Sequence, residues 1–150
     1  MSSVDVRAAA LADVQGAVGM YEWLFDPPGA RPPGWDPARA SAALARAVAS
    51  DDAVVLVAVA EGAFAGLCTA YDDIESVRFG RRVWVEDLAV DPQWRSLGIG
   101  KRLLDQAKEW ARARGATHLE LDSGIARTDA HRFYDREQPS SRSICFGWTL

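Results

Sequence analysis

Apolar residues along the chain alternate with polar ones or form short unbroken runs, and both patterns predict β-strands. The clearest run is valine-rich, at residues 53–60, and the Glu61-Gly62 turn after it predicts a hairpin. In the strand near residue 86 the apolar phase changes at Glu86-Asp87, which predicts a β-bulge. The predicted strands cover residues 3–7, 53–60, 64–71, 81–90, 117–121 and 143–150.

Apolar residues at helical spacing predict four helices among these strands. Asp36 and Pro37 have the residue types preferred at the N-cap and the first position of a helix. Gly115 is suited to end the longest helix. Residues 26–37 contain five prolines and two glycines, which predict a surface loop. The predicted helices cover residues 13–25, 37–50, 98–114 and 128–137.

The order of these elements predicts the fold class. Short turns join the central strands, so these pair antiparallel, whereas a strand-helix-strand crossover near the end requires a parallel pair. We therefore expect an α/β (α+β) protein with a mixed sheet and helices on both faces. Residues 1–150 have the length of one domain, since single domains most often run about 100–150 residues.

Composition excludes several classes of function. A net charge of −4 argues against general binding to nucleic acid or to an anionic membrane. Cys68 and Cys145 cannot form a disulfide framework or a CxxC site, which favours a reduced, cytoplasmic setting. The two histidines exclude a histidine-rich metal site, and we expect no metal. The longest apolar run, residues 53–60, is far shorter than the ~20 residues of a membrane span.

The segment VWVEDLAVDPQWRSLGIGK, residues 83–101, carries the strongest chemical signal. It joins a strand, a turn and the start of the longest helix. Gly98 and Gly100 allow a ligand to approach the backbone, because no Cβ intervenes. The free N–H groups and the dipole at a helix start favour a pyrophosphate, and Arg95 and Lys101 add positive charge.

Two common phosphate-binding loops do not fit this segment. A P-loop would need Ser or Thr after Gly100-Lys101, where the chain has Arg102. A dinucleotide-binding GxGxxG loop would need glycine at the position of Leu103. The remaining pattern is [R/Q]xxGxG between a strand and an amphipathic helix.

With this motif the chain resembles the GNAT-type N-acetyltransferase superfamily, most closely over residues 83–134. The resemblance implies a mostly antiparallel central sheet whose fourth and fifth strands splay apart to hold acyl-coenzyme A. It implies that the pantetheine arm pairs with the backbone of Leu88, Ala89 and Val90. It also implies a pyrophosphate loop that consists of Arg95, Ser96, Leu97, Gly98, Ile99, Gly100 and Lys101.

A second stretch, LDSGIARTDAHRFY at residues 121–134, supports the same resemblance. Phe133 and Tyr134 match the family, and the resemblance implies that Tyr134 protonates the leaving thiolate. Arg127 stands where the family often has Asn, so we expect it to face a cofactor phosphate or the acceptor. Gln138-Pro139 replaces the usual Gly-Phe and alters the turn into the last strand.

The implied reaction is direct acetyl transfer, which needs a base for the acceptor amine. Strand alternation indicates that one of Glu86 and Asp87 faces the site, and we favour Glu86 as the base, directly or through a water. Asp87 is a candidate acceptor contact. A backbone N–H near Leu88 is the candidate oxyanion donor. The proline-rich loop makes Trp35 a candidate acceptor contact. The acidic residues between 72 and 75 are expected either to attract a cationic acceptor or to lie in a solvated loop.

The function expected from the resemblance is N-acetylation of a small primary amine with acetyl-coenzyme A. Three alternatives stay open: a non-catalytic acyl-CoA sensor of the same fold, a protein or peptide N-acetyltransferase, and a nucleotide-binding protein unrelated to acyl transfer. No nucleic-acid or membrane partner is expected. The resemblance leaves open whether the chain forms a homodimer.

Overall fold

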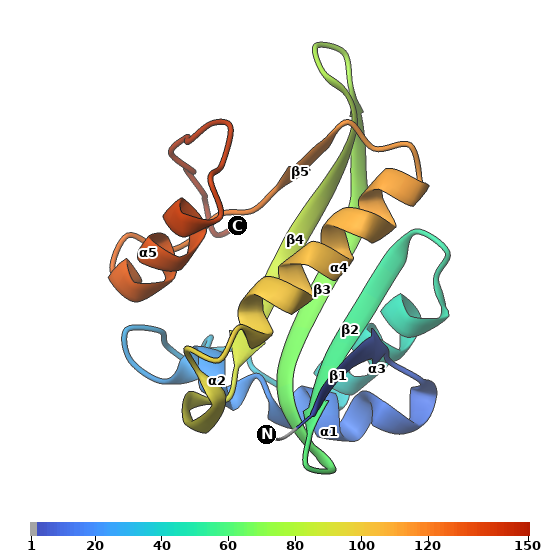
Figure 1. Cartoon of the computed structure of the whole chain (residues 1–150), viewed down its shortest axis with the longest axis vertical. Helices are drawn as coiled ribbons and strands as arrows, with labels where there is room; N and C mark the ends of the chain where they lie inside the picture. Colours follow the sequence, from blue (N-terminus) through green and yellow to red (C-terminus); the bar gives the residue numbers. More distant parts are fainter. Residues whose placement is uncertain (1–2) are drawn as a thin grey trace.

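A five-stranded sheet forms the centre of the protein in the computed structural model, which describes residues 3–150 (Figure 1). Neighbouring strands pair antiparallel, except that β4 and β5 are parallel. This arrangement confirms the mixed, mostly antiparallel sheet. In spatial and chain order the strands are β1 (Val4–Ala8), β2 (Ala53–Ala60), β3 (Ala63–Ser76), β4 (Gly80–Val90) and β5 (His118–Glu120).

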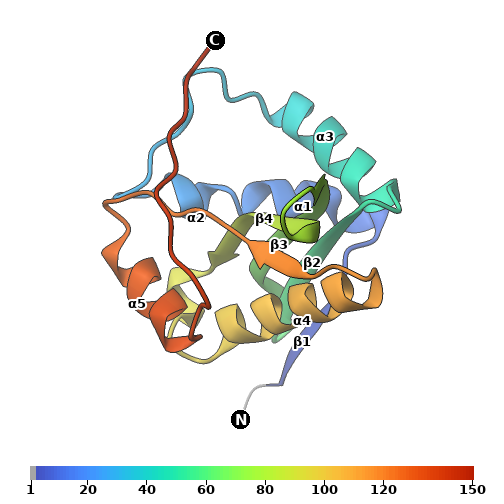
Figure 2. The same cartoon turned by 90° about the horizontal axis from the view of Figure 1, so that it is seen from above.

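Helices cover both faces of the sheet, as expected (Figure 2). On one face α4 packs on the sheet through Ile99, Leu103 and Ala107. On the other face α1 and α3 enclose a second core that contains the fully buried Leu67. The helices are α1 (Val14–Gly19), α2 (Glu22–Phe25), α3 (Pro37–Ala49), α4 (Ile99–Ala113) and α5 (Thr128–Arg136), with 3-10 turns η1 (Leu11–Asp13) and η2 (Pro92–Trp94).

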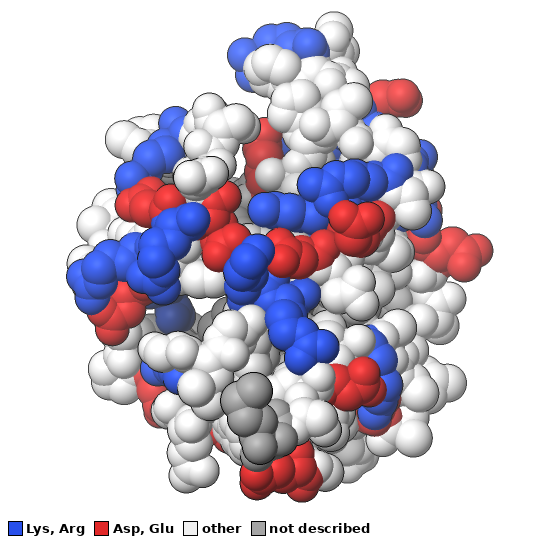
Figure 3. Space-filling model, viewed as in Figure 1, with Lys and Arg blue, Asp and Glu red and all other residues white. Residues whose placement is uncertain are grey.

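The surface around α4 carries interleaved charges of both signs rather than one basic patch (Figure 3). Lys101 pairs with Asp105, and Arg112 pairs with Glu109 along the same helix. Among the helices of residues 3–150, none combines the length and the apolar character needed to cross a membrane.

The bulge and the splay, which position the site, are both present. Thr69 pairs with Asp87 and Ala70 with Val85, so Glu86 is the extra residue of a bulge in β4. The β4–β5 ladder covers only residues 82–84 and 118–120, although β4 continues to Val90. The two strands therefore part after Trp84, as the resemblance implied.

The predicted single helix at residues 13–25 is wrong, because it divides into α1 and α2. The N–H groups of Met20 and Tyr21 donate to the carbonyls three residues earlier, at 3.1 and 3.2 Å. This tighter turn follows Gly19, the last residue of α1. This turn directs the Tyr21 side chain toward β4, where its hydroxyl donates a hydrogen bond to Asp87.

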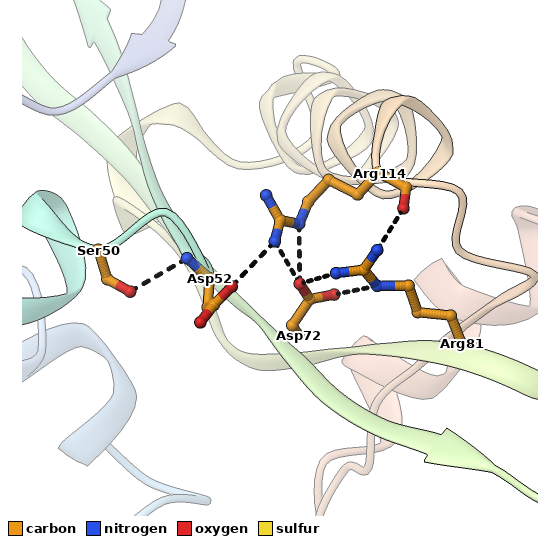
Figure 4. Close-up of polar contacts among 5 residues, drawn as sticks. All are labelled: Ser50, Asp52, Asp72, Arg81 and Arg114. Atoms are coloured by element: carbon orange, nitrogen blue, oxygen red, sulfur yellow. Dashed lines mark hydrogen bonds and ion pairs between the residues drawn. The ribbon is translucent and has the colours of Figure 1, made fainter.

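The third strand extends beyond its predicted end at residue 71, since β3 continues to Ser76 and pairs with the start of β4. The acidic residues 72–75 therefore lie in a hairpin and not in a solvated loop. Asp72 accepts hydrogen bonds from Arg81 and from Arg114 at the end of α4 (Figure 4). Arg114 also reaches Asp52, so this cluster ties α4 to both hairpins.

The predicted final strand at residues 143–150 is wrong. Residues 139–150 are neither helix nor strand, and the apolar side chains that alternate there, from Ile144 to Leu150, are exposed. Gln138 has a φ of 56°, and Pro139 after it lacks an N–H group. The chain therefore turns away after α5, and no described strand pairs with the segment.

Candidate active site

A pocket of about 190 Å³ lies where β4 and the segment after β5 part. It gathers five of the predicted site residues, which come from two distant parts of the sequence. Its wall is formed by Leu24 of α2, by Val85, Glu86, Asp87 and Leu88 of β4, by Leu121, Asp122, Ser123 and Gly124 after β5, and by Arg127, Ala130 and Tyr134 at α5.

The two neighbouring carboxylates of β4 have different surroundings. The Asp87 Oδ2 atom accepts hydrogen bonds from the Tyr21 hydroxyl at 2.7 Å and from Thr69 Oγ1 at 3.0 Å. Glu86 is exposed at the bulge and accepts one hydrogen bond, from the Trp84 indole at 2.8 Å. Glu86 thus keeps an oxygen free to accept a proton, whereas Asp87 is held in place by two donors.

Tyr21 and Thr69 contact Asp87 of the candidate site, although the sequence did not indicate them. Tyr21 lies 66 positions from Asp87, and no local pattern connects them. Burial and the negative charge of Asp87 raise the pKa of Tyr21 far above its usual value. Tyr21 is therefore a permanent hydrogen-bond donor to Asp87.

Trp35 does not line this pocket. It borders a separate hollow of about 380 Å³ between α1 and α3. Its ring packs on Phe25 and on Tyr21, with centroids 4.8 and 5.7 Å apart. Trp35 therefore contacts Tyr21, whose hydroxyl donates to Asp87 of β4.

Tyr134 lies on α5, on the wall of the pocket, beside Phe133. Burial raises the pKa of its hydroxyl to about 12, so it is protonated at neutral pH. The hydroxyl makes no hydrogen bond with any of the residues 3–150. It is thus a proton donor without a protein acceptor.

Arg127 stands just before α5 and connects it to the N-terminal helices. Its Nη2 atom donates to the Leu24 carbonyl at 2.9 Å. A methyl group added at Gly29 would lie only 2.6 Å from the same atom, so the proline-rich loop is close. Arg127 therefore lies beside the pocket and the proline-rich loop.

The predicted pyrophosphate loop leads into α4 with its backbone exposed. Gly98 is the N-cap with a φ of 83°, and no side chain caps the helix. The first amide with an acceptor is that of Arg102, which donates to the Gly98 carbonyl at 3.1 Å. The N–H groups of Ile99, Gly100 and Lys101 therefore point out of the helix start without a helical acceptor.

The loop leaves open space at the start of α4, and Arg95 and Lys101 lie beside it. A methyl group at Gly98 would meet no atom within 4 Å, so the helix start is not plugged. Arg95 donates to the Val90 carbonyl at 3.2 Å, and Lys101 Nζ lies 2.8 Å from Asp105. Gly100 approaches the Phe133 ring, which places the loop beside the helix that carries Tyr134.

Neither cysteine is suited to form a covalent intermediate. Cys68 is fully buried, and burial raises its pKa to about 12, so it is a neutral thiol. Cys145 is exposed in the C-terminal segment, and a hydrogen bond with Asp122 raises the pKa of its thiol. Within residues 3–150, no group of His, Cys, Asp or Glu is arranged to hold a metal ion.

Two curated proteins share local sequence with the chain. An uncharacterized N-acetyltransferase of Bacillus subtilis (strain 168), YhdJ, is 44% identical over 72 residues, which are 48% of this chain and 50% of that protein. The aminoalkylphosphonate N-acetyltransferase of Salmonella typhimurium is 49% identical over 53 residues, 35% of this chain and 34% of that enzyme. The chain thus spans half or less of the length of these relatives.

Solved structures show the same fold. The aminoglycoside N-acetyltransferase AAC(6')-Iy in complex with CoA superimposes with a TM-score of 0.85 at 18% identity, covering 100% of this chain and 96% of the other. The model of the acetyltransferase (GNAT) family matches residues 17–138. Because that match includes both the loop at the start of α4 and the pocket beside β4, the chain belongs to the GNAT acetyltransferase family.

Proposed function

We propose that the protein transfers an acetyl group from acetyl-coenzyme A to a primary amine of a small cationic molecule. The observation that carries the proposal is a juxtaposition. The start of α4 is uncapped and suits a diphosphate. Through Val90 and Phe133 it adjoins the pocket that brings Glu86 and Tyr134 together.

In this proposal the cofactor lies along β4, from the helix start to the pocket. The amides of residues 99–101, with Arg95 and Lys101, hold the diphosphate. The backbone of Leu88, Ala89 and Val90 pairs with the pantetheine arm, because β4 has no strand neighbour on that side after Trp84. Bound there, acetyl-coenzyme A supplies the thioester carbon that the amine attacks.

Glu86 is proposed to take the proton from the acceptor, directly or through one water. An ammonium group cannot attack a carbonyl, so this step makes the nucleophile. The Glu86 side chain suits the step because it is exposed and has an oxygen without a partner. The Leu88 amide is the proposed donor to the developing oxyanion.

Tyr134 is proposed to donate its proton to the departing thiolate. Its pKa of about 12 makes it a weak acid in water. However, the burial that raises the pKa of the phenol also raises that of a thiol in the same pocket. Donor and acceptor are therefore shifted in the same direction, and proton transfer remains feasible.

The charges around the pocket support a cationic acceptor. Three carboxylates line it, those of Glu86, Asp87 and Asp122, against one guanidinium, that of Arg127. Arg127 already donates to the Leu24 carbonyl. An acceptor with several ammonium groups would thus be favoured, and the structurally similar aminoglycoside enzyme is named for acceptors of that kind.

A second acceptor class is favoured by Arg127 itself. A guanidinium group binds phosphonates well, and one relative is named for aminoalkylphosphonates. Since only one cation faces three carboxylates, we rank this class second.

The test combines cofactor binding with turnover. We expect isothermal titration to detect acetyl-coenzyme A binding, and thiol release to be faster with neamine or spermidine than with 2-aminoethylphosphonate. Binding without thiol release from any amine would support the sensor alternative, and release only with N-terminal peptides the peptide alternative. Faster release with the phosphonate would reverse the order of the two acceptor classes. An absence of heat at millimolar acetyl-coenzyme A would refute the proposal.

A further inference from the structure

Ser123 carries an anomaly in the pocket wall. Its Oγ atom is buried and has no hydrogen-bond partner, alone among the buried side-chain nitrogens and oxygens of residues 3–150. Buried polar groups are normally hydrogen-bonded, because losing water without gaining a partner destabilises the fold. A ligand in the pocket is the kind of partner that would satisfy this hydroxyl.

The Ser123 hydroxyl neither closes the turn that follows it nor caps α5. The turn after it is closed by the backbone, with the Arg127 N–H donating to the Gly124 carbonyl at 2.9 Å. The N-cap of α5 is Arg127, so the serine does not cap that helix. Alanine would satisfy the same backbone without leaving a polar atom unpaired.

The position of Ser123 relates it to the proposed reaction. It lies on the segment after β5 and lines the pocket together with Glu86 of β4 and Tyr134 of α5. Its Oγ atom is shielded from solvent, and no hydrogen bond of the described structure has to break when the side chain rotates about the Cα–Cβ bond to present Oγ to the pocket. Its hydroxyl can accept one hydrogen bond while donating another.

We propose that Ser123 binds the acceptor, with Oγ accepting a hydrogen bond from the amine that attacks the thioester. This inference rests on the proposed function. Ser123 holds one N–H of the amine while Glu86 removes the ammonium proton, and the neutral amine then stays beside the thioester carbon as it turns its lone pair toward it. Ser123 is then a substrate-binding residue that fixes the direction of attack.

The test compares Ser123→Ala with Ser140→Ala, which removes an exposed hydroxyl outside the pocket. With the panel amine that the wild type acetylates fastest, we expect Ser123→Ala to lower kcat/KM for the amine about tenfold, the worth of one hydrogen bond. The dissociation constant of acetyl-coenzyme A should not change. Tm should stay constant or rise, because an unpaired buried group is removed.

Ser123→Cys separates hydrogen bonding from shape. A thiol fills similar space but hydrogen-bonds weakly, so this variant should resemble Ser123→Ala. If Ser123→Cys behaves like the wild type, the role is steric and the inference is wrong. It is also wrong if Ser123→Ala keeps its kcat/KM, or if Tm and cofactor affinity fall together. An inactive wild type would instead refute the proposed function, and the role of Ser123 with it.

Discussion

Replacing Tyr134 with phenylalanine tests the chemistry most directly. The substitution removes one hydroxyl that makes no hydrogen bond in the described structure, and it keeps the ring that packs on Phe133. We therefore expect the free energy of unfolding to change by no more than about 0.5 kcal/mol. Any large change in rate would then reflect the reaction and not the fold.

The expected magnitude follows from the partial burial of Tyr134. General acid catalysis typically contributes about 10²–10⁴-fold to a rate. Because Tyr134 is only partly buried, water can replace it to some extent, which places the effect near the lower limit. We expect kcat to fall about 100-fold, equivalent to about 2.7 kcal/mol of activation free energy.

The assay is thiol release at saturating acetyl-coenzyme A, with binding of the cofactor measured separately by titration. Ser140→Ala is the control, since it removes an exposed hydroxyl outside the pocket lining. Because burial raises the pKa of Tyr134 to about 12, the wild type should show no loss of kcat from its ionisation below about pH 11. If kcat of Tyr134→Phe stays within about twofold of the wild type, Tyr134 is not the acid.

Three further substitutions test the loop, the ion-pair cluster and the core. Gly100→Ala should weaken acetyl-coenzyme A binding at least about tenfold without lowering Tm. The control Gly19→Ala, whose new methyl meets no atom within 4 Å, should leave binding unchanged. Equal affinities of the two variants would contradict the loop assignment. Asp72→Asn should lower the free energy of unfolding by about 1–3 kcal/mol at pH 7. Burial raises the pKa of Asp72, but hydrogen bonds from Arg114 and a second arginine lower it by more. The stabilisation is therefore present above the ordinary pKa of the unfolded state and is lost as pH falls through the depressed pKa of the folded state. In urea unfolding, the difference in free energy of unfolding between Asp72→Asn and the wild type should shrink below about pH 3.9. A constant difference would contradict this. Gly66→Ala places a methyl 2.9 Å from an α4 side chain and should cost about 1–3 kcal/mol in urea unfolding; a loss under about 0.5 kcal/mol would show that the core adjusts freely.

Local patterns were sufficient for much of the fold. Alternation, helical spacing, and turn and cap residues depend on neighbours within a few positions, so β2, α3 and α4 lie where the sequence predicted them. The bulge at Glu86 was also predictable from neighbouring residues, because the alternation of apolar residues changes phase there. The helix start at Gly98 was recognisable for the same reason, since its chemistry is contained in consecutive residues.

The errors at residues 143–150 and at the end of β3 fall where pairing between distant segments decides the outcome. Residues 143–150 alternate like a strand, but a strand exists only if another strand offers hydrogen bonds, and none of residues 3–150 does so. β3 extends past its predicted end for the opposite reason, because β4 supplies partners and arginines neutralise the acidic residues.

The amino-acid sequence by itself determined most of the elements, the helix start that we propose binds phosphate and the residue types available for proton transfer, because each of these depends on near neighbours along the chain. Only the tertiary structure decided which of them meet. Arg127 donates to Leu24 across 103 positions, and Tyr21 holds Asp87 across 66. The unpaired hydroxyl of Ser123 is likewise a property of the assembled pocket, since whether a buried atom has a partner depends on every segment packed around it.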